Sequence, residues 1–213
     1  SVSGLTGNTT YYWRIKPKNS CGEGSYSDAF NFKTLIPSYC LSTFTDEVSG
    51  SEHLTNVTFN SINNDSENDL IDGYEDFTSI STTVKRGSSY QHSVVFDTGG
   101  YQDNCTVFID WNQDYVFDII TEKYDLGTGY DDISTKTLDI TVPNDALIGA
   151  TRMRVVLEYT GSSPNGEGAC DEDHNSEWGE TEDYTVIIED STASFIDEPF
   201  GNFMLFPNPT KGE

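Results

Sequence analysis

The chain is organised as short runs in which apolar and polar residues alternate, a pattern that predicts β-strands rather than helices. The clearest run places Met153, Val155 and Leu157 on one face and charged side chains on the other, and only Val156 breaks the alternation. Comparable runs, separated by turn-forming residues, lie at 54–62, 81–85, 90–96, 106–111, 137–142, 152–159 and 184–188. Seven or more short strands of this kind predict an all-β fold arranged as a β-sandwich.

The first 34 residues contain two further predicted strands, at 11–16 and 29–33. Two strands do not form a stable domain in water, so we expect residues 1–34 to be the last part of a module whose other strands precede Ser1. The leucine six residues before Tyr11 resembles part of the tyrosine corner of a fibronectin type III domain, and residues 19–34 resemble its last hairpin and closing strand. The resemblance implies a truncated fibronectin type III sandwich fragment at residues 1–34.

The remaining chain divides at two predicted linkers. Residues 35–38, which include a proline, are a predicted linker to a second module at 39–190, and residues 191–202 are a second linker. The segment 203–213 contains Pro207-Asn208-Pro209 followed by Thr, Lys and Gly, and resembles the opening of the C-terminal sorting domain of type IX secretion in Bacteroidetes. This resemblance implies the type IX secretion machinery as a partner; the alternative is an ordinary proline turn.

The net charge excludes some classes of binding partner, and the cysteine content indicates the cellular compartment. With 36 acidic and 11 basic residues, the net charge of -25 repels phosphate and anionic lipid, so nucleic acid and membrane surfaces are poor partners. No apolar run approaches the length of a membrane span. The four cysteines include no CxxC pair and predict disulfides in an extracytoplasmic compartment. Of three pairings we favour Cys40 with Cys170, which bracket the second module; a bridge from Cys21 to Cys105 would require the two modules to dock.

An acidic stretch beginning at residue 110 is the strongest candidate for a metal site. Oxygen-bearing side chains on alternate residues, followed by a further carboxylate, suit Ca²⁺, which takes six to eight oxygen ligands. The candidate ligands are the side chains of Asp110, Asn112, Asp114, Asp118 and Glu122 and the backbone carbonyl of Val116.

This stretch departs from the calcium loop of a helix-loop-helix site in two ways. Tyr115 occupies the sixth position, where such loops prefer glycine, and Glu122 stands at position 13 instead of 12. We therefore expect a structural calcium loop rather than a signalling sensor. The alternative is a solvated acidic turn.

A second acidic group lies at the start of the last predicted strand, where Glu180, Glu182 and Asp183 follow one another closely. Because side chains alternate along a strand, Glu180 and Glu182 can share one face while Asp183 points to the other. The glutamate pair has three interpretations: a second cation site, a glycosidase dyad, or partners for Arg152 and Arg154. The ion pair with the arginines is the interpretation we favour.

The motif Gly179-Glu180-Thr181-Glu182-Asp183 differs by one residue from the signature of the GEVED domain. Further segments that resemble this family, in the same order, lie at 39–40, 73–78, 109–112, 142–143 and 149–155. The resemblance spans about 39–189 and implies a β-rich accessory module of secreted Bacteroidetes proteins, often found beside fibronectin type III repeats, adhesion modules or secreted peptidases. It implies no activity.

Signatures of catalysis are missing from the sequence, which has no HExxH helix, GxSxG elbow or P-loop. We therefore expect a noncatalytic, calcium-stabilised interaction module of a larger secreted or cell-surface protein. An extracellular glycan or protein is the expected ligand, and Tyr124, Tyr130 and Trp178 are candidate exposed aromatics. The alternative is the C-terminal accessory region of a secreted hydrolase, most plausibly a metallopeptidase with its catalytic domain upstream.

Overall fold

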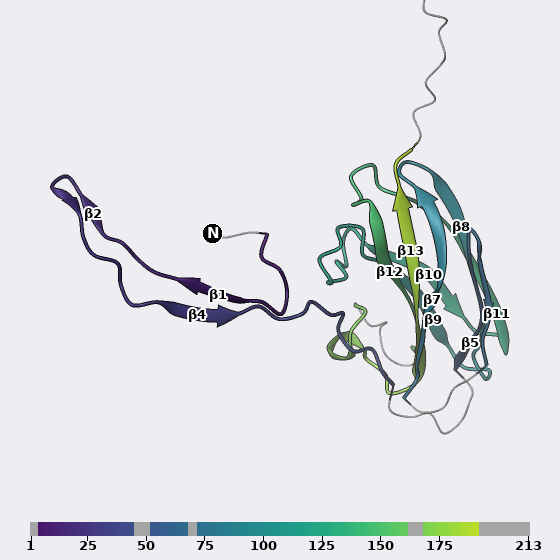
Figure 1. The fold of residues 1–213 in the computed structure, drawn as a ribbon. Helices are drawn as coiled ribbons and strands as arrows, with labels where there is room; N and C mark the ends of the chain where they lie inside the picture. The colour runs from purple at the N-terminus through teal and green to yellow at the C-terminus, as the bar shows by residue number, and fades with distance from the viewer. Residues whose placement is uncertain (1–3, 45–51, 68–71, 162–167, 192–213) are drawn as a thin grey trace, which may run out of the picture.

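The computed structural model describes residues 4–44, 52–67, 72–161 and 168–191, and within these residues it contains strands and one short 3-10 helix (Figure 1). The predicted sorting segment 203–213 lies outside the described residues. The elements are β1 Thr10–Trp13, β2 Lys18–Asn19, β3 Gly22–Glu23, β4 Phe30–Lys33, β5 His53–Phe59, β6 Ile62–Asp65, β7 Tyr74–Lys85, β8 Ser89–Asp97, β9 Asp103–Ile109, β10 Lys123–Gly129, β11 Ile133–Thr141, β12 Gly149–Tyr159, η1 Asp171–Asp173 and β13 Gly179–Glu189.

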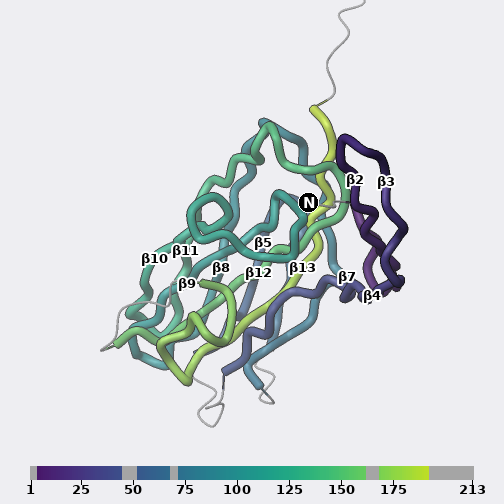
Figure 2. Tube along the Cα trace, turned by 90° about the vertical axis from the view of Figure 1, so that its left-hand side faces the viewer, coloured from purple at the N-terminus to yellow at the C-terminus, as the bar shows by residue number. Residues whose placement is uncertain are grey.

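Strands β5 to β13 form two sheets that face each other, which confirms the predicted β-sandwich (Figure 1). One sheet has the order β10-β9-β12-β13-β7, which can be followed across the labels of Figure 2, and the other has the order β11-β8-β5-β6. All neighbours pair antiparallel except β13 and β7, which run parallel. The parallel pair places the 179–183 motif beside residues 74–77.

The main core lies between the two sheets and follows the predicted alternation. In β12, Met153, Val155 and Leu157 are fully buried in this core, where they meet apolar side chains of both sheets. The fully buried residues facing them include Leu54, Val57, Phe59, Val94, Phe96, Val107, Ile109, Tyr184 and Val186. Removing this apolar surface from water is the main source of stability for such a fold.

A second, smaller apolar cluster covers the outer face of the five-stranded sheet. Phe108 and Val156 project outward and pack with Phe44, Phe117 and Ala169, which come from the connecting segments. This cover explains why Val156 breaks the alternation, since a strand buried on both faces takes apolar residues at consecutive positions. It also explains why every residue of β9 is buried.

The predicted strand pattern was wrong at two places. The predicted strand at 54–62 is a hairpin, because Asn60 adopts a left-handed conformation (φ 52°) and turns the chain between β5 and β6. β10 was not predicted, because it carries two glycines and only one buried aliphatic side chain, Leu126.

No helix in the described part of the chain is both long and apolar enough to cross a membrane.

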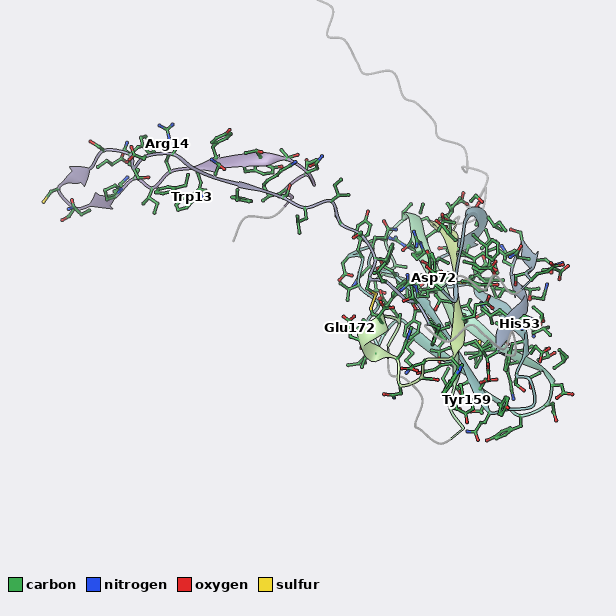
Figure 3. The ribbon with its side chains drawn as sticks, turned by 90° about the horizontal axis from the view of Figure 1, so that it is seen from below. Trp13, Arg14, His53, Asp72, Tyr159 and Glu172 are labelled. Carbon is green, nitrogen blue, oxygen red and sulfur yellow. A yellow bond between two sulfur atoms is a disulfide. The ribbon has the colours of Figure 1, made fainter. Side chains whose placement is uncertain are left out.

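The N-terminal strands form a narrow ribbon that extends to one side of the sandwich in Figures 1 and 3. β1 pairs with β4, and the rings of Trp13 and Phe30 stack with centroids 5.0 Å apart, yet these side chains remain 45% and 52% exposed. The Thr6 N–H donates to the hydroxyl of Tyr11 at 2.7 Å, a hydrogen bond of the type that a tyrosine corner makes. Assignment of this ribbon to a fibronectin type III domain stays a prediction.

Candidate functional site

The acidic motif at the start of β13 divides its side chains between the two faces of the sheet. Glu180 and Glu182 share the inner face with Tyr184, which belongs to the main core. Thr181 and Asp183 lie on the outer face, where Thr181 hydrogen-bonds Ser42 at 2.8 Å. All four are buried, so the motif places three carboxyl groups inside the protein.

The glycine that opens the motif is required by the backbone. Gly179 has a φ of +149°, a conformation that residues with a side chain rarely adopt. A Cβ atom at this position would lie 2.2 Å from the backbone oxygen of Leu157 and 2.9 Å from ring carbons of Phe44. Glycine therefore lets β13 approach β12 and the outer cover closely.

Asp183 is the partner of both arginines. Its Oδ1 accepts from Arg154 Nε at 2.8 Å and its Oδ2 from Arg154 Nη2 at 2.9 Å, and Arg152 also pairs with Oδ2. The Tyr74 hydroxyl donates to Oδ2 at 2.9 Å, and burial and this charge raise the pKa of Tyr74 to about 12. The favoured prediction that Glu180 and Glu182 would pair with the arginines was wrong, because those glutamates face the opposite side of the sheet.

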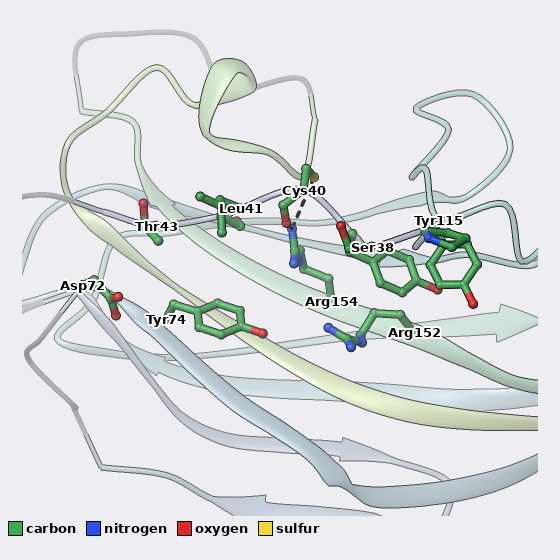
Figure 4. Close-up of a pocket in the computed structure, with 12 residues that line it drawn as sticks. Ser38, Cys40, Leu41, Thr43, Asp72, Tyr74, Tyr115, Arg152 and Arg154 are labelled. Atoms are coloured by element: carbon green, nitrogen blue, oxygen red, sulfur yellow. Dashed lines mark hydrogen bonds between the residues drawn. The ribbon is translucent and has the colours of Figure 1, made fainter. Parts of the chain in front are cut away.

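Arg154 also holds the cover against the sheet. Its Nη1 donates to the backbone oxygen of Cys40 at 3.1 Å (Figure 4). It also donates to the backbone oxygen of Ala169 at 2.7 Å. Cys40 forms a disulfide with Cys170, as the sequence predicted. Cys21 and Cys105 are both free, so the possible second bridge, between the two modules, is not formed. One guanidinium group thus joins the motif to both segments that the disulfide links.

A chain of contacts leads from Asp183 to the acidic loop at 110–122. The Arg152 guanidinium lies over the ring of Tyr39, 4.8 Å from its centroid. The Tyr39 hydroxyl donates to Asp110 Oδ2 at 2.7 Å, and burial is the main cause that raises the pKa of Tyr39. The two acidic regions singled out in the sequence are therefore connected through Arg152 and Tyr39.

The first half of the acidic loop is held by hydrogen bonds from backbone amides to side-chain oxygens. Asp110 accepts from the N–H groups of Asp114 at 3.2 Å and Tyr115 at 3.1 Å, and Asn112 Oδ1 accepts from Asp114 at 2.9 Å. Asp114 Oδ1 in turn accepts from Val116 N–H at 2.9 Å. Tyr115, which occupies the position where glycine was expected, adopts a φ of 70°. These bonds fix the directions of the oxygens at alternate positions.

The second half of the loop is closed by Glu122, which is only 2% exposed. Its Oε1 accepts from Trp111 N–H at 2.8 Å and its Oε2 from Asp118 N–H at 3.0 Å, while burial raises its pKa. Asp118 caps the turn that follows it, and the backbone hydrogen bonds from Thr121 and Ile120 lower its pKa. The predicted ligands thus form one compact loop, and calcium binding by this loop stays a prediction.

Within the part of the chain that the structure describes, one group of three His, Cys, Asp or Glu side chains brings its ligand atoms within 4.8 Å of one another: Glu75, Glu180 and Glu182. Sequence reasoning missed Glu75, because its proximity depends on the parallel pairing that sets Glu75 opposite Glu182. The segment 73–78 was noted for its resemblance to the GEVED family, but neither periodicity nor spacing assigned Glu75 a role.

A pocket of about 430 Å³ opens on the outer face beside the ion pairs (Figure 4). The segment from Pro37 to Thr43 forms one wall, and Tyr74, Tyr115 and Arg152 also line the pocket. Of the predicted exposed aromatics, Tyr130 and Trp178 are 64% and 37% exposed. Tyr124 instead packs against the main core, and its hydroxyl accepts from Trp111 Nε1 at 2.8 Å.

These features define an all-β module with a disulfide-linked cover, a buried acidic motif and an adjoining acidic loop. Residues 104–187 match the family model of the GEVED domain. The matched segment runs from β9 into β13 and includes both the loop and the 179–183 motif. The match indicates an accessory module of a larger protein. Comparison with curated proteins gave no match.

Proposed function

We propose that residues 39–190 form a noncatalytic, calcium-stabilised accessory module of a larger secreted or cell-surface protein. The observation that carries the proposal is the ladder of backbone hydrogen bonds to Asp110, Asn112 and Asp114. Each bond uses part of a side chain's acceptor capacity and orients the rest, so the loop presents oxygens at alternate positions, as a calcium loop requires.

A cation in the loop would stabilise the module because the loop holds separate segments together. Leu147 donates from its backbone N–H to the Trp111 carbonyl oxygen at 2.8 Å, and Gln113 donates back to the Leu147 carbonyl oxygen at 2.8 Å. Tyr39, next to the disulfide, reaches Asp110. Ca²⁺ would neutralise the carboxylates that the loop gathers and so strengthen all three connections.

An extracellular location and export by type IX secretion complete the proposal. The disulfide supports an oxidising compartment, where such bonds persist. The net charge of -25 on the whole chain disfavours contact with nucleic acid and anionic membranes. The resemblance of 203–213 to a sorting domain supports the export route.

Calcium titration of the chelator-treated protein tests the central claim. We expect millimolar Ca²⁺ to raise the thermal unfolding midpoint, since a ligand that binds only the native state stabilises it. The Asp110→Asn/Asp114→Asn variant should lose most of this rise. Asp139→Asn, an exposed carboxylate on β11, is the matched control and should keep it. An unchanged loop variant contradicts the proposed calcium loop.

The pocket beside Arg152 is our proposed contact surface for an extracellular glycan or protein ligand. Its aromatic walls, Tyr74 and Tyr115, and the partly exposed Arg152 offer flat apolar surface together with hydrogen-bond donors. Tyr115→Ala, at a side chain 42% exposed, should weaken binding to a glycan array or to candidate extracellular proteins. Tyr130→Ala, outside the pocket lining, should leave binding unchanged; equal loss in both variants contradicts this placement.

A further inference from the structure

Three glutamates meet on the inner face of the five-stranded sheet, on the side opposite Arg152 and Arg154. Glu182 on β13 pairs in register with Glu75 on the parallel strand β7, and Glu180 precedes Glu182 on the same face. Ligand oxygens of all three lie within 4.8 Å of one another. The nearby arginines are engaged by Asp183 on the outer face.

The centre of the cluster is withdrawn from solvent. Glu180 is 2% exposed and Glu182 is 0% exposed, while Glu75 is partly exposed at the edge strand β7. Carboxylates packed this closely without bulk water repel one another strongly, so they coexist only with a bound cation or a shared proton. The exposed side of Glu75 gives the cluster a route to solvent.

Glu182 points to a ligand that is not supplied by the described residues. Its Oε2 accepts from the Tyr184 hydroxyl at 2.6 Å, and Asn64 donates to that same hydroxyl at 3.0 Å. Ser66 also hydrogen-bonds this carboxyl group. The other oxygen, Oε1, is fully buried and has no hydrogen-bond partner among the described residues. A buried carboxylate oxygen without a donor or a cation costs stability, so its retention favours a bound ion.

We propose that Glu75, Glu180 and Glu182 bind one divalent cation, Ca²⁺, at a second site that is separate from the 110–122 loop. Oxygens bound at 2.3–2.6 Å to one Ca²⁺ lie at most about 5 Å apart, which fits the observed separation. The donor atoms are all carboxylate oxygens, which suit a hard cation rather than zinc or copper.

The proposed ion lies between structural elements that are distant in the sequence. Glu75 comes from the edge strand β7, and the other two ligands come from β13. Glu180 Oε2 also accepts from the backbone N–H of Leu54 on β5, which belongs to the opposite sheet. Binding of the ion would therefore fasten β7 to β13 and both to the four-stranded sheet.

Calcium stoichiometry of the full chain separates this site from the loop. Chelator-treated protein is titrated with CaCl₂ by calorimetry, and bound calcium is counted by elemental analysis after gel filtration. We expect two equivalents, with one lost in Glu180→Gln/Glu182→Gln and the other lost in Asp110→Asn/Asp114→Asn. Glu189→Gln, an exposed glutamate at the end of the same strand, should keep both.

Glu75→Gln provides a second variant should the buried double change prevent folding, because Glu75 is only half-buried. It should weaken the second equivalent at least tenfold and leave the first unchanged. The proposal is overturned if the folded glutamate variants keep the wild-type stoichiometry. If calcium is lost only in the loop variant, the glutamate site is overturned and the 110–122 loop is supported. If calcium is lost only in the glutamate variants, the glutamate site is supported and the loop is contradicted.

Discussion

Arg154 and Asp183 form a bidentate ion pair in which neither side chain is more than 2% exposed. The guanidinium joins β12 to β13 and, through its third nitrogen, reaches the carbonyl oxygens on both sides of the disulfide. An ion pair buried this deeply is costly to break, because removal of one partner leaves the other charge without compensation.

We predict that Arg154→Met lowers the free energy of unfolding by about 3 kcal/mol, measured by urea denaturation. Arg152 continues to pair with Asp183, which limits the loss. Arg154→Met/Asp183→Asn should recover part of it, because the double variant no longer buries a carboxylate that has lost one of its two arginine partners. Arg86→Met, which breaks a pair with the exposed Asp190, should cost about 1 kcal/mol or less. Equal costs for Arg154→Met and Arg86→Met would refute the account.

Gly179→Ala should destabilise the module by about 2 kcal/mol or more, because it combines backbone strain with a clash against Leu157 and Phe44. Gly127→Ala is the matched control: Gly127 also has a positive φ, +94°, but a Cβ atom there would meet nothing within 4 Å. Both substitutions place a side chain at a positive φ, so we expect the clash to make the loss of unfolding free energy larger at Gly179 than at Gly127. A smaller loss of unfolding free energy at Gly179 than at Gly127 would contradict the clash and show that Leu157 and Phe44 move aside at little cost.

Alternation along single strands was the part of the fold that the sequence predicted best. It placed Met153, Val155 and Leu157 in the core and assigned Glu180 and Glu182 to one face, since both inferences need only the period of two. The disulfide followed from the positions of Cys40 and Cys170 at the two ends of the module.

Pairing between distant strands was the part that the sequence could not supply. The proximity of Glu75 and Glu182 depends on the parallel register of β7 and β13. The pairing of Asp183 with the two arginines depends on the register of β12 and β13, which sets these side chains on the same face of the sheet. β10 escaped prediction because its stability comes from pairing with β9 and not from its own apolar pattern. These are tertiary relationships, which local patterns do not encode.

We predict that the buried His92 makes the folded protein less stable in acid. It is fully buried, its ring nitrogens have no hydrogen-bond partner among the described residues, and burial lowers its pKa from 6.5 to about 3. Between pH 6.5 and about 3 the unfolded chain binds a proton that the folded chain does not. The free energy of unfolding therefore decreases as the pH is lowered through this range, by up to about 1.4 kcal/mol per pH unit. Urea denaturation between pH 4 and 7 should show a shallower acid decline in His92→Leu than in the wild type. Parallel curves would exclude this contribution.

We predict that the buried Asp103 has the opposite effect: it makes the free energy of unfolding decrease as the pH rises. Its carboxyl group is fully buried, without a hydrogen-bond partner among the described residues, and burial, with the charges of Glu52 and Asp97, raises its pKa from 3.8 to about 8. The folded protein therefore keeps a proton that the unfolded chain releases above about pH 4, and the free energy of unfolding falls as pH rises from about 4 to 8.

Asp103→Asn imitates the protonated carboxyl group and should remove this contribution, which amounts to at most about 1.4 kcal/mol per pH unit. The variant should be more stable than the wild type at pH 8, and the advantage should shrink toward pH 5, as measured by urea denaturation at each pH. Asp139→Asn changes an exposed carboxylate and should follow the wild-type curve. If Asp103→Asn follows it too, Asp103 is ionised in the folded protein and its charge is stabilised by contacts other than those described.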